Sequence, residues 1–200
     1  MNFKTKRLIL RPPRKSDWKD IVEGCKDLEV SKWLAVVPYP YNKKEAMEFI
    51  NKKIKDLRKK EKYSYVFFIE LKSEKKVIGV TDIHEINKLD KTAKTGTWIN
   101  KNYWRHGYIL EAKVPVLDFV FNKLKLRKIE TEAFVENKAS NAMSKKLGFK
   151  KEGTKIKTTI CNATRKIHDA NIYGLLKEEW KKIRPKIIKE INRKMKNEKP

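Results

Sequence analysis

The sequence predicts an α+β fold, a mixed α/β domain in which helices are inserted among strands without a regular repeat. Short segments of alternating or continuous apolar residues are typical of strands, and longer segments with apolar residues every three or four positions are typical of helices. Their order differs from the regular βαβ alternation of a doubly wound sheet. The length of 200 residues, with 40% apolar residues, suits one globular domain with its own core.

The first half of the chain begins with a strand pattern. Leu8 and Leu10 recur with a period of two, and Pro12 and Pro13 end this pattern. Ser16 or Asp17 is suited to cap the helix that follows. In order, the sequence predicts a strand at 6–11, a helix at 16–26, a loop at 33–41, a helix at 43–60 and a hairpin of strands 65–71 and 76–83.

The second half continues this mixed order. Pro115 lies inside an apolar helical segment and removes one backbone hydrogen bond, so we expect a kink there. Gly148 is suited to end the next helix at its C′ position. In order, the sequence predicts a strand at 96–100, a helix at 108–124, a strand at 128–135, a helix at 137–147 and strands near 153–159 and 167–175.

The C-terminal segment is rich in lysine. Residues 179–200 carry nine basic and three acidic side chains, and Ile183, Ile187 and Ile191 recur every four positions. This spacing predicts a helix, which either docks one apolar edge on the domain or serves as a phosphate- or partner-binding appendage. We therefore divide the chain into a domain at 1–178 and a Lys-rich helical tail at 179–200.

The chain is strongly basic, with 50 Lys and Arg against 25 Asp and Glu and a net charge of +25. Such a field favours polyanions, such as nucleic acid, ribosomes, acidic proteins or phosphate-bearing cofactors. However, 41 of the basic residues are Lys, whereas base recognition prefers Arg and aromatic platforms. The charge is therefore explained either by a Lys-rich proteome or by a useful affinity for a polyanion.

Several function classes are disfavoured. The longest apolar runs have four or five residues, far below the ~20 that span a bilayer. Leu8–Leu10 lies between Arg7 and Arg11 and does not resemble a secretory signal. We therefore expect a cytoplasmic protein that is not bound to a membrane. Cys25 and Cys161 are isolated, so neither a disulfide framework nor a metal site is implied.

One segment has the pattern of a phosphate-binding turn. Residues 98–112 run from a strand through Gly107 directly into a helix. Such a turn aims free N–H groups at one point, and the helix dipole adds positive charge there. Arg105 and His106 supply further donors, so the turn could cradle a pyrophosphate. An ordinary left-handed turn has the same sequence signature.

A second segment begins at Asn137, with Ser140 three positions later. Asn137 is suited to cap a helix, with Ser140 at its third position, and this structural interpretation is sufficient for the segment alone.

Taken in order, these segments resemble the GNAT acetyltransferases, and within them the ribosomal-protein N-acetyltransferase (RimJ/RimL) branch. The similarity spans residues 4–176 and implies a central mixed, mostly antiparallel twisted sheet flanked by helices. Its motifs are Arg7-Leu8-Ile9-Leu10-Arg11, Pro38-Tyr39-Pro40-Tyr41, Tyr103-Trp104-x-x-Gly107-Tyr108-x-x-Glu111-Ala112, Asn137-Lys138-Ala139-Ser140, Lys146-Leu147-Gly148-Phe149-Lys150-Lys151-Glu152-Gly153 and His168-Asp169-x-Asn171-x-Tyr173.

The resemblance implies direct transfer of an acetyl group from acetyl-CoA to a primary amine. A backbone N–H within residues 98–100 would bind the thioester oxygen, Asn137 would bind the pantetheine amides or the acetyl group, and Ser140 would donate to the leaving thiolate. The residues that it places at acetyl-CoA are Trp98, Ile99, Asn100, Arg105, His106, Gly107, Tyr108, Ile109, Leu110, Asn137 and Ser140.

Two residues depart from the family pattern. Ile109 stands where a small residue usually lets phosphate approach the backbone, and it would weaken binding if it faced inward. Lys94 replaces an acid that could serve as the general base.

The base is left open among Asp82, His84, Glu85, Glu132 and a water chain to solvent. We take His84 and Glu85, with Ser140, as the catalytic candidates. Strand alternation would put Asp82 and His84 on one face and Glu85 on the other. We interpret His168 and Asp169 of the late motif as structural residues.

The resemblance favours the N-terminal α-amine of a ribosomal protein as acceptor. A net charge of +25 would repel polyamines and aminoglycosides and favour an acidic or ribosome-bound partner. A small-molecule amine remains an alternative. A further alternative is a degenerate GNAT domain that binds RNA or the ribosome through its basic surface. Homodimers are expected from the resemblance alone.

Overall fold

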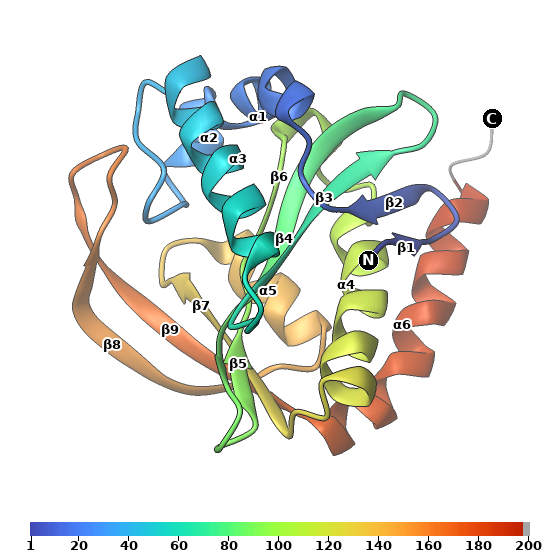
Figure 1. The fold of residues 1–200 in the computed structure, drawn as a ribbon. Helices are drawn as coiled ribbons and strands as arrows, with labels where there is room; N and C mark the ends of the chain where they lie inside the picture. Colours follow the sequence, from blue (N-terminus) through green and yellow to red (C-terminus); the bar gives the residue numbers. More distant parts are fainter. Residues whose placement is uncertain (198–200) are drawn as a thin grey trace.

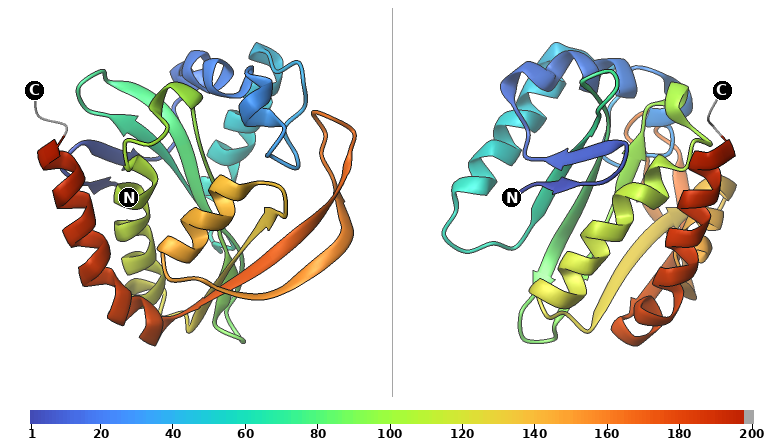
Figure 2. Two further views of the ribbon diagram at one scale, coloured as in Figure 1. Left: turned by 180° about the vertical axis from the view of Figure 1, so that it is seen from behind. Right: turned by 90° about the vertical axis from the view of Figure 1, so that its right-hand side faces the viewer.

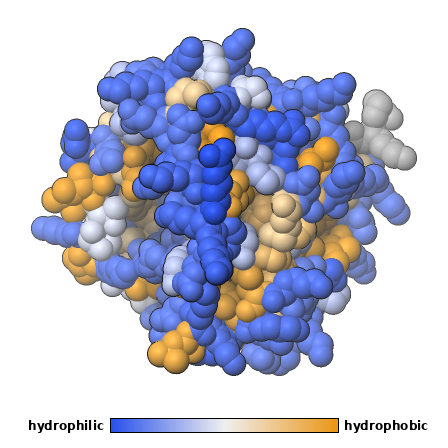
Figure 3. Space-filling view, viewed as in Figure 1, coloured by the Kyte–Doolittle hydropathy of each residue, from blue (hydrophilic) through white to orange (hydrophobic). Residues whose placement is uncertain are grey.

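A computed structural model describes residues 1–197 of the protein (Figure 1). A twisted sheet forms its centre and has helices on both faces, as Figure 2 shows from behind and from the side. The predicted α+β class, with a mixed and mostly antiparallel sheet, is confirmed. Hydrophilic side chains predominate on the face shown in Figure 3, as expected for a chain with 38% charged residues.

Nine strands form the sheet within the described residues, in the order β1-β2-β3-β4-β5-β7-β9-β8, and β6 pairs with β4. The pair β5–β7 is parallel and the other pairs are antiparallel. The strands are β1 (Phe3–Lys4), β2 (Leu8–Arg11), β3 (Tyr65–Leu71), β4 (Lys76–Asn87), β5 (Thr92–Lys94), β6 (Thr97–Ile99), β7 (Lys128–Phe134), β8 (Lys150–Ile160) and β9 (Ile167–Leu176).

Two apolar clusters hold the helices to the sheet. One packs α4, α5 and α6 on one face, and the other packs α1 and α3 on the opposite face (Figure 2). The helices are the 3₁₀ turn η1 (Lys15–Asp17), α1 (Trp18–Cys25), α2 (Leu28–Ser31), α3 (Lys43–Arg58), the 3₁₀ turn η2 (Lys101–Tyr103), α4 (Tyr108–Asp118), the π-helix η3 (Phe119–Lys123), α5 (Lys138–Lys146) and α6 (Lys177–Asn197).

The helix predicted at 16–26 is confirmed as α1, which follows the 3₁₀ turn η1, and the short helix α2 after it was not predicted. Asp17 is at the N-cap position of α1, but its side chain does not cap that helix. Its carboxylate instead accepts from the buried Arg11 guanidinium at 2.8 and 2.9 Å and from the Arg14 N–H at 2.7 Å. Glu70 takes the Arg11 Nε at 2.5 Å, so this ion network joins β2 and β3 to η1.

Other elements differ mainly at their ends. The short strands β1 and β5 were not predicted. The regular α-helix in the segment predicted at 108–124 ends at Asp118 and continues as the π-helix η3. Gly148 has φ +89° directly after α5, as predicted for a C′ glycine.

The C-terminal helix α6 packs against α4. Trp180, Ile187 and Ile191 are buried, and Asp118 of α4 accepts from the Trp180 indole at 2.9 Å and from the Arg184 guanidinium at 2.8 Å. Residues 198–200 of the predicted tail lie outside the described residues. Within 1–197, no helix combines the length and the hydropathy needed to cross a membrane.

We expect Gly148→Ala to lower the free energy of unfolding by about 1–3 kcal/mol. Its left-handed backbone disfavours a side chain, and a Cβ there would lie 2.9 Å from Cγ2 of Ile183 in α6. Urea denaturation measures the change. Gly153→Ala is the matched control, since a Cβ at Gly153 meets nothing within 4 Å. Equal stability of the two variants would contradict this account of the α5–α6 contact.

Candidate functional site

The sheet opens into a fork between β6 and β7. β5 pairs with β7 through Lys94, and the last backbone bond between the two sides is from the Thr95 N–H to the Glu130 carbonyl, at 2.8 Å. Beyond it, the Thr131 hydroxyl donates to the Thr95 carbonyl at 2.9 Å. Among the described strand pairings, β6 continues along β4 alone. The closed end of the fork is therefore at Thr95 and Gly96.

The backbone of β6 presents hydrogen-bonding groups to this fork. Asn100 N–H donates to Ile78 of β4 at 2.8 Å, and Gly96 accepts from β4 at 3.1 Å. Since successive residues of a strand point to opposite sides, Thr97 and Ile99 direct their N–H groups toward β7. Within the predicted segment 98–100, Ile99 is therefore the residue whose N–H faces the fork, and Thr97 presents a second N–H nearer the closed end.

The side chains of β6 have structural partners. Trp98 lies against α1, where a Cβ at Gly24 would be only 2.5 Å from its ring, and Ile99 is buried in the main core. The Asn100 side chain accepts from the Asn102 N–H at 3.1 Å and begins η2. Trp98, Ile99 and Asn100, which were predicted to contact acetyl-CoA, therefore face the fork with backbone groups, while their side chains have structural partners.

The predicted phosphate turn lies at the open end of β6. Gly107 has φ +76° and is the N-cap of α4, and the first helical bond is from Glu111 N–H to the Gly107 carbonyl, at 3.1 Å. The N–H groups of residues 108–110 therefore precede the hydrogen-bonded part of the helix and point out of its N-terminus. The positive helix dipole acts at the same place.

Cationic side chains from distant segments surround this turn. Arg7 donates to the His106 carbonyl at 2.9 Å and pairs with Glu111 at 2.7 Å. Lys194 of α6 is 3.4 Å from the Arg105 carbonyl, and a Cβ at Gly107 would lie 3.1 Å from its Cδ. The sequence analysis did not place Arg7 or Lys194 here, because nothing in their local pattern shows that both chain ends meet α4.

The turn fits a pyrophosphate group. Gly107 leaves the space that a Cβ would fill, N–H groups converge on it, and cations border it. Ile109 does not obstruct this cradle, since its side chain packs against the main core cluster. Because the side chain of Ile109 faces the core, its size does not keep a phosphate from the backbone of the turn.

The second wall of the fork leads to the N-terminus of α5. The side-chain oxygen of Asn137 accepts from the Ser140 N–H at 3.0 Å, so Asn137 caps the helix, as its sequence position suggested. The NH₂ group of Asn137 makes no hydrogen bond within the described residues. The Ser140 hydroxyl is half-buried and has no hydrogen-bond partner among the described residues.

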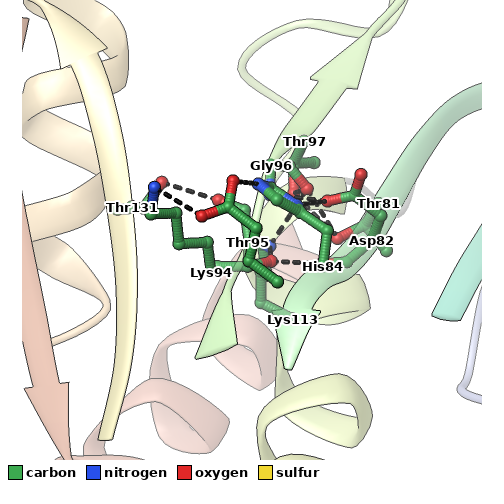
Figure 4. Close-up of polar contacts among 10 residues, drawn as sticks. Thr81, Asp82, His84, Lys94, Thr95, Gly96, Thr97, Lys113 and Thr131 are labelled. Carbon is green, nitrogen blue, oxygen red and sulfur yellow. Dashed lines mark hydrogen bonds and ion pairs between the residues drawn. The ribbon is translucent and has the colours of Figure 1, made fainter. Parts of the chain in front are cut away.

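A polar cluster surrounds the closed end of the fork (Figure 4). Asp82 accepts from the Gly96 N–H at 2.7 Å and contacts His84 Nδ1 at 3.1 Å. The Thr95 hydroxyl donates to the Asp82 carbonyl. From the other face, the buried Lys113 of α4 donates to the Thr95 hydroxyl at 2.6 Å. The sequence predicts Asp82 and His84 as candidates, whereas no local pattern points to Lys113.

The charge of Asp82 is set by competing effects. Burial favours its neutral form, but the hydrogen bond and charge of His84, the Gly96 N–H and the charge of Lys113 together hold its pKa below the usual value. An ionised Asp82 favours the His84 tautomer with its proton on Nδ1 and leaves Nε2 as a proton acceptor. The pair therefore has the arrangement of a general base and its orienting carboxylate.

The predicted faces of β4 need one correction. Asp82 and His84 share a face, as expected, but Glu85 lies on the same side and not opposite. Its φ of +51° at an irregularity of β4 turns its carboxylate to Lys94, 2.7 Å away, and to within 4.0 Å of His84 Nε2. That ion pair with Lys94 lowers the pKa of Glu85, so Glu85 is a weak base.

The remaining candidates are also held by partners. Glu132 pairs with Lys155 at 2.7 Å. His168 stacks on Phe134 with ring centroids 4.3 Å apart, and Asp169 accepts from the Lys157 N–H at 2.7 Å. His168 also has a carboxylate at Nδ1, from Glu136 at 3.4 Å, but its Nε2 is buried. His84 combines an orienting carboxylate with a side chain that is 36% exposed, so it is the better placed base.

Residues 7–150 match the family described as the Acetyltransferase (GNAT) domain. The chain belongs to the GNAT acetyltransferase family. Its members are acetyl-CoA-dependent N-acetyltransferases, so the predicted family and enzyme class are confirmed.

Relatives and solved structures are similar to this GNAT acetyltransferase along most of the chain. The N-acetyltransferase YoaA of Bacillus subtilis is 29% identical over 180 residues, covering 88% of this chain and 96% of that protein. The ribosomal-protein-serine acetyltransferase of Escherichia coli is 28% identical over 56% of this chain and 60% of its own length. A GNAT-family acetyltransferase from Bacillus anthracis has a TM-score of 0.75 and 25% identity, covering 89% of this chain and 99% of its own.

We expect Gly107→Glu to abolish acetyl-CoA binding, because a carboxylate would occupy the cradle at the N-terminus of α4. Isothermal titration with acetyl-CoA measures the affinity, and thermal unfolding checks the fold. Gly153→Glu adds the same charge and bulk at an open position of β8 and serves as the control. An unchanged affinity in Gly107→Glu would remove the turn from the cofactor site.

Proposed function

We propose that this GNAT enzyme transfers the acetyl group of acetyl-CoA to the N-terminal α-amine of a protein, with ribosomal proteins as the acceptor class. The chemistry is supported foremost by the Asp82–His84 pair beside the closed end of the fork, within 3.1 Å of each other. The acceptor class is supported by the relative named as a ribosomal-protein-serine acetyltransferase. A net charge of +25 favours ribosome-bound or acidic acceptors over polyamines.

The two ends of the fork would hold different parts of acetyl-CoA. The Gly107 turn, with Arg105, His106 and Lys194 around it, would bind the phosphates. The edge of β6 that faces β7, where the Ile99 carbonyl also accepts from the Trp104 indole at 2.8 Å, would pair with the pantetheine amides. When bound, acetyl-CoA supplies an activated acetyl thioester. The Thr97 N–H, which faces β7 at the end of β6 nearer the closed end of the fork, would donate to its carbonyl oxygen, whose negative charge grows during transfer.

His84 would act as the general base. Only a neutral amine attacks an acyl group, so the amine of the acceptor must lose a proton, and Nε2 of His84 would receive it. Asp82 would orient the ring and stabilise its protonated form. Ser140, with its free hydroxyl at the other wall of the fork, would donate a hydrogen bond to the departing sulfur.

His84→Gln should lower kcat/KM by about 100-fold at neutral pH, because the proton acceptor is lost. The Kd of acetyl-CoA should stay within about twofold, since His84 lies outside the phosphate and pantetheine contacts. Steady-state kinetics and isothermal titration measure the two quantities. Glu85→Gln, next to it in β4, should retain its activity. If Glu85→Gln lost activity and His84→Gln kept it, the assignment of the base would be reversed.

The acceptor class is tested with purified protein, acetyl-CoA and matched substrates. Peptides that carry the N-terminal sequences of ribosomal proteins, the same peptides with a blocked N-terminus, and spermidine are compared by mass spectrometry. We expect acetylation of the free N-terminus alone. Acetylation of spermidine in preference to every peptide would establish a small-amine acetyltransferase instead, and acetyl-CoA binding without any transfer would contradict both.

A further inference from the structure

Among the residues whose burial the structure describes, Lys113 is the one buried lysine, with 4% of its surface exposed. It extends from α4 through the main core to the closed end of the fork. Its ammonium group donates to the Thr95 hydroxyl at 2.6 Å and lies 3.4 Å from the Gly96 carbonyl. Lys113 takes no part in the proposed proton transfer, although burying a charge without a directly paired carboxylate is costly.

We propose that Lys113 is an electrostatic positioning residue of the transfer site, whose ammonium stabilises the negative charge that acetyl transfer creates at the closed end of the fork. This inference rests on the proposed acetyl-CoA site. If the phosphates lie at Gly107 and the pantetheine arm follows β6, the thioester is carried toward Thr95 and Gly96. The sulfur and the carbonyl oxygen would then both lie near the Lys113 charge.

The surroundings of Lys113 support a role for its charge over a purely structural role. The Gly96 carbonyl already accepts from the Asp82 N–H at 3.1 Å and from the Thr97 hydroxyl at 2.6 Å. The Thr95 hydroxyl already donates to Asp82. These hydrogen bonds fix the backbone of Thr95 and Gly96, the two residues between β5 and β6, without a contribution from Lys113. What Lys113 alone adds is a positive charge in a region of low dielectric, where charges act strongly.

The charge state of Lys113 depends on few neighbours. Burial lowers its pKa to about 8, and the Asp82 carboxylate partly opposes this shift. The other charged groups on the strands packed against it lie on the opposite face of the sheet: His84 of β4, Lys94 of β5, and Glu130 and Glu132 of β7. Lys113 is therefore charged below about pH 8 and loses its proton above it.

The test compares the pH dependence of turnover in the wild type and in Lys113→Met, with saturating acetyl-CoA and acceptor peptide. At pH 7, where Lys113 is charged, we expect kcat to be about tenfold lower in the variant, with the Kd of acetyl-CoA nearly unchanged. The ratio of the two kcat values should fall toward one as the pH rises through about 8, because the wild type then loses the ammonium charge.

Two further variants separate the effect of the Lys113 charge from the loss of a hydrogen-bond donor and from the loss of any one lysine charge. Lys113→Gln keeps an N–H donor without a charge and should behave like Lys113→Met. Lys123→Met makes the same chemical change at an exposed position of η3 and should behave like the wild type.

Stability supplies an independent measurement. The folded pKa of Lys113 lies below its ordinary value of 10.5, so the wild type is destabilised relative to Lys113→Met as the pH falls from 10.5 through about 8. We therefore expect Lys113→Met to unfold at an equal or higher temperature at pH 7, while its turnover is lower. A structural lysine would lose stability and activity together.

Failure of the Lys113 role and failure of the acetyl-CoA site would give different results. A kcat ratio between wild type and Lys113→Met that does not change with pH, or a wild-type kcat in Lys113→Gln at pH 7, would overturn the role of the Lys113 charge and leave the acetyltransferase site intact. Failure of the wild type to bind CoA would overturn both.

Discussion

The end of the parallel ladder at Thr95 is the constraint on which the rest of the site depends. Buried backbone N–H and C=O groups need partners, and a continuous pairing of β6 with β7 would close the fork. Side chains take over where the ladder stops: the Thr131 hydroxyl satisfies the Thr95 carbonyl, and Asp82 satisfies the Gly96 N–H. The free edge of β6 and the separation of the α4 and α5 N-termini follow from this local exchange of backbone for side-chain hydrogen bonds.

The same side-chain hydrogen bonds place Asp82 and His84 beside the fork. Asp82 serves both the backbone of Gly96 and the ring of His84, so one carboxylate joins the shape of the fork to the orientation of the base. Lys113 reaches this point from the opposite face. A buried ammonium with a lowered pKa is unfavourable for stability, and groups of this kind concentrate at functional sites.

Both ends of the chain support the phosphate turn. Arg7 near the N-terminus joins Glu111 of α4 and the carbonyl of His106, and Lys194 near the end of α6 lies over Gly107. The rigid helix α4 thus carries the turn at its N-terminus, Lys113 in its middle and the Asp118 contact with α6 at its C-terminus. Two of the 50 basic residues of the chain, Arg7 and Lys194, thus lie at the Gly107 turn.

Sequence by itself determined the order and type of most elements, because apolar periodicity and the turn-forming residues Gly107 and Gly148 specify structure within a few neighbouring residues. It also determined the family, through motifs of fixed spacing. It also indicated Asp82 and His84 as neighbours on one face. Only the tertiary structure decided that Glu85 turns to Lys94 at an irregular backbone position, that Asn137 is occupied as a cap, and that Arg7, Lys113 and Lys194 converge on the site. The reason is physical: these contacts join residues far apart in the chain, and local propensity carries no information about such distances.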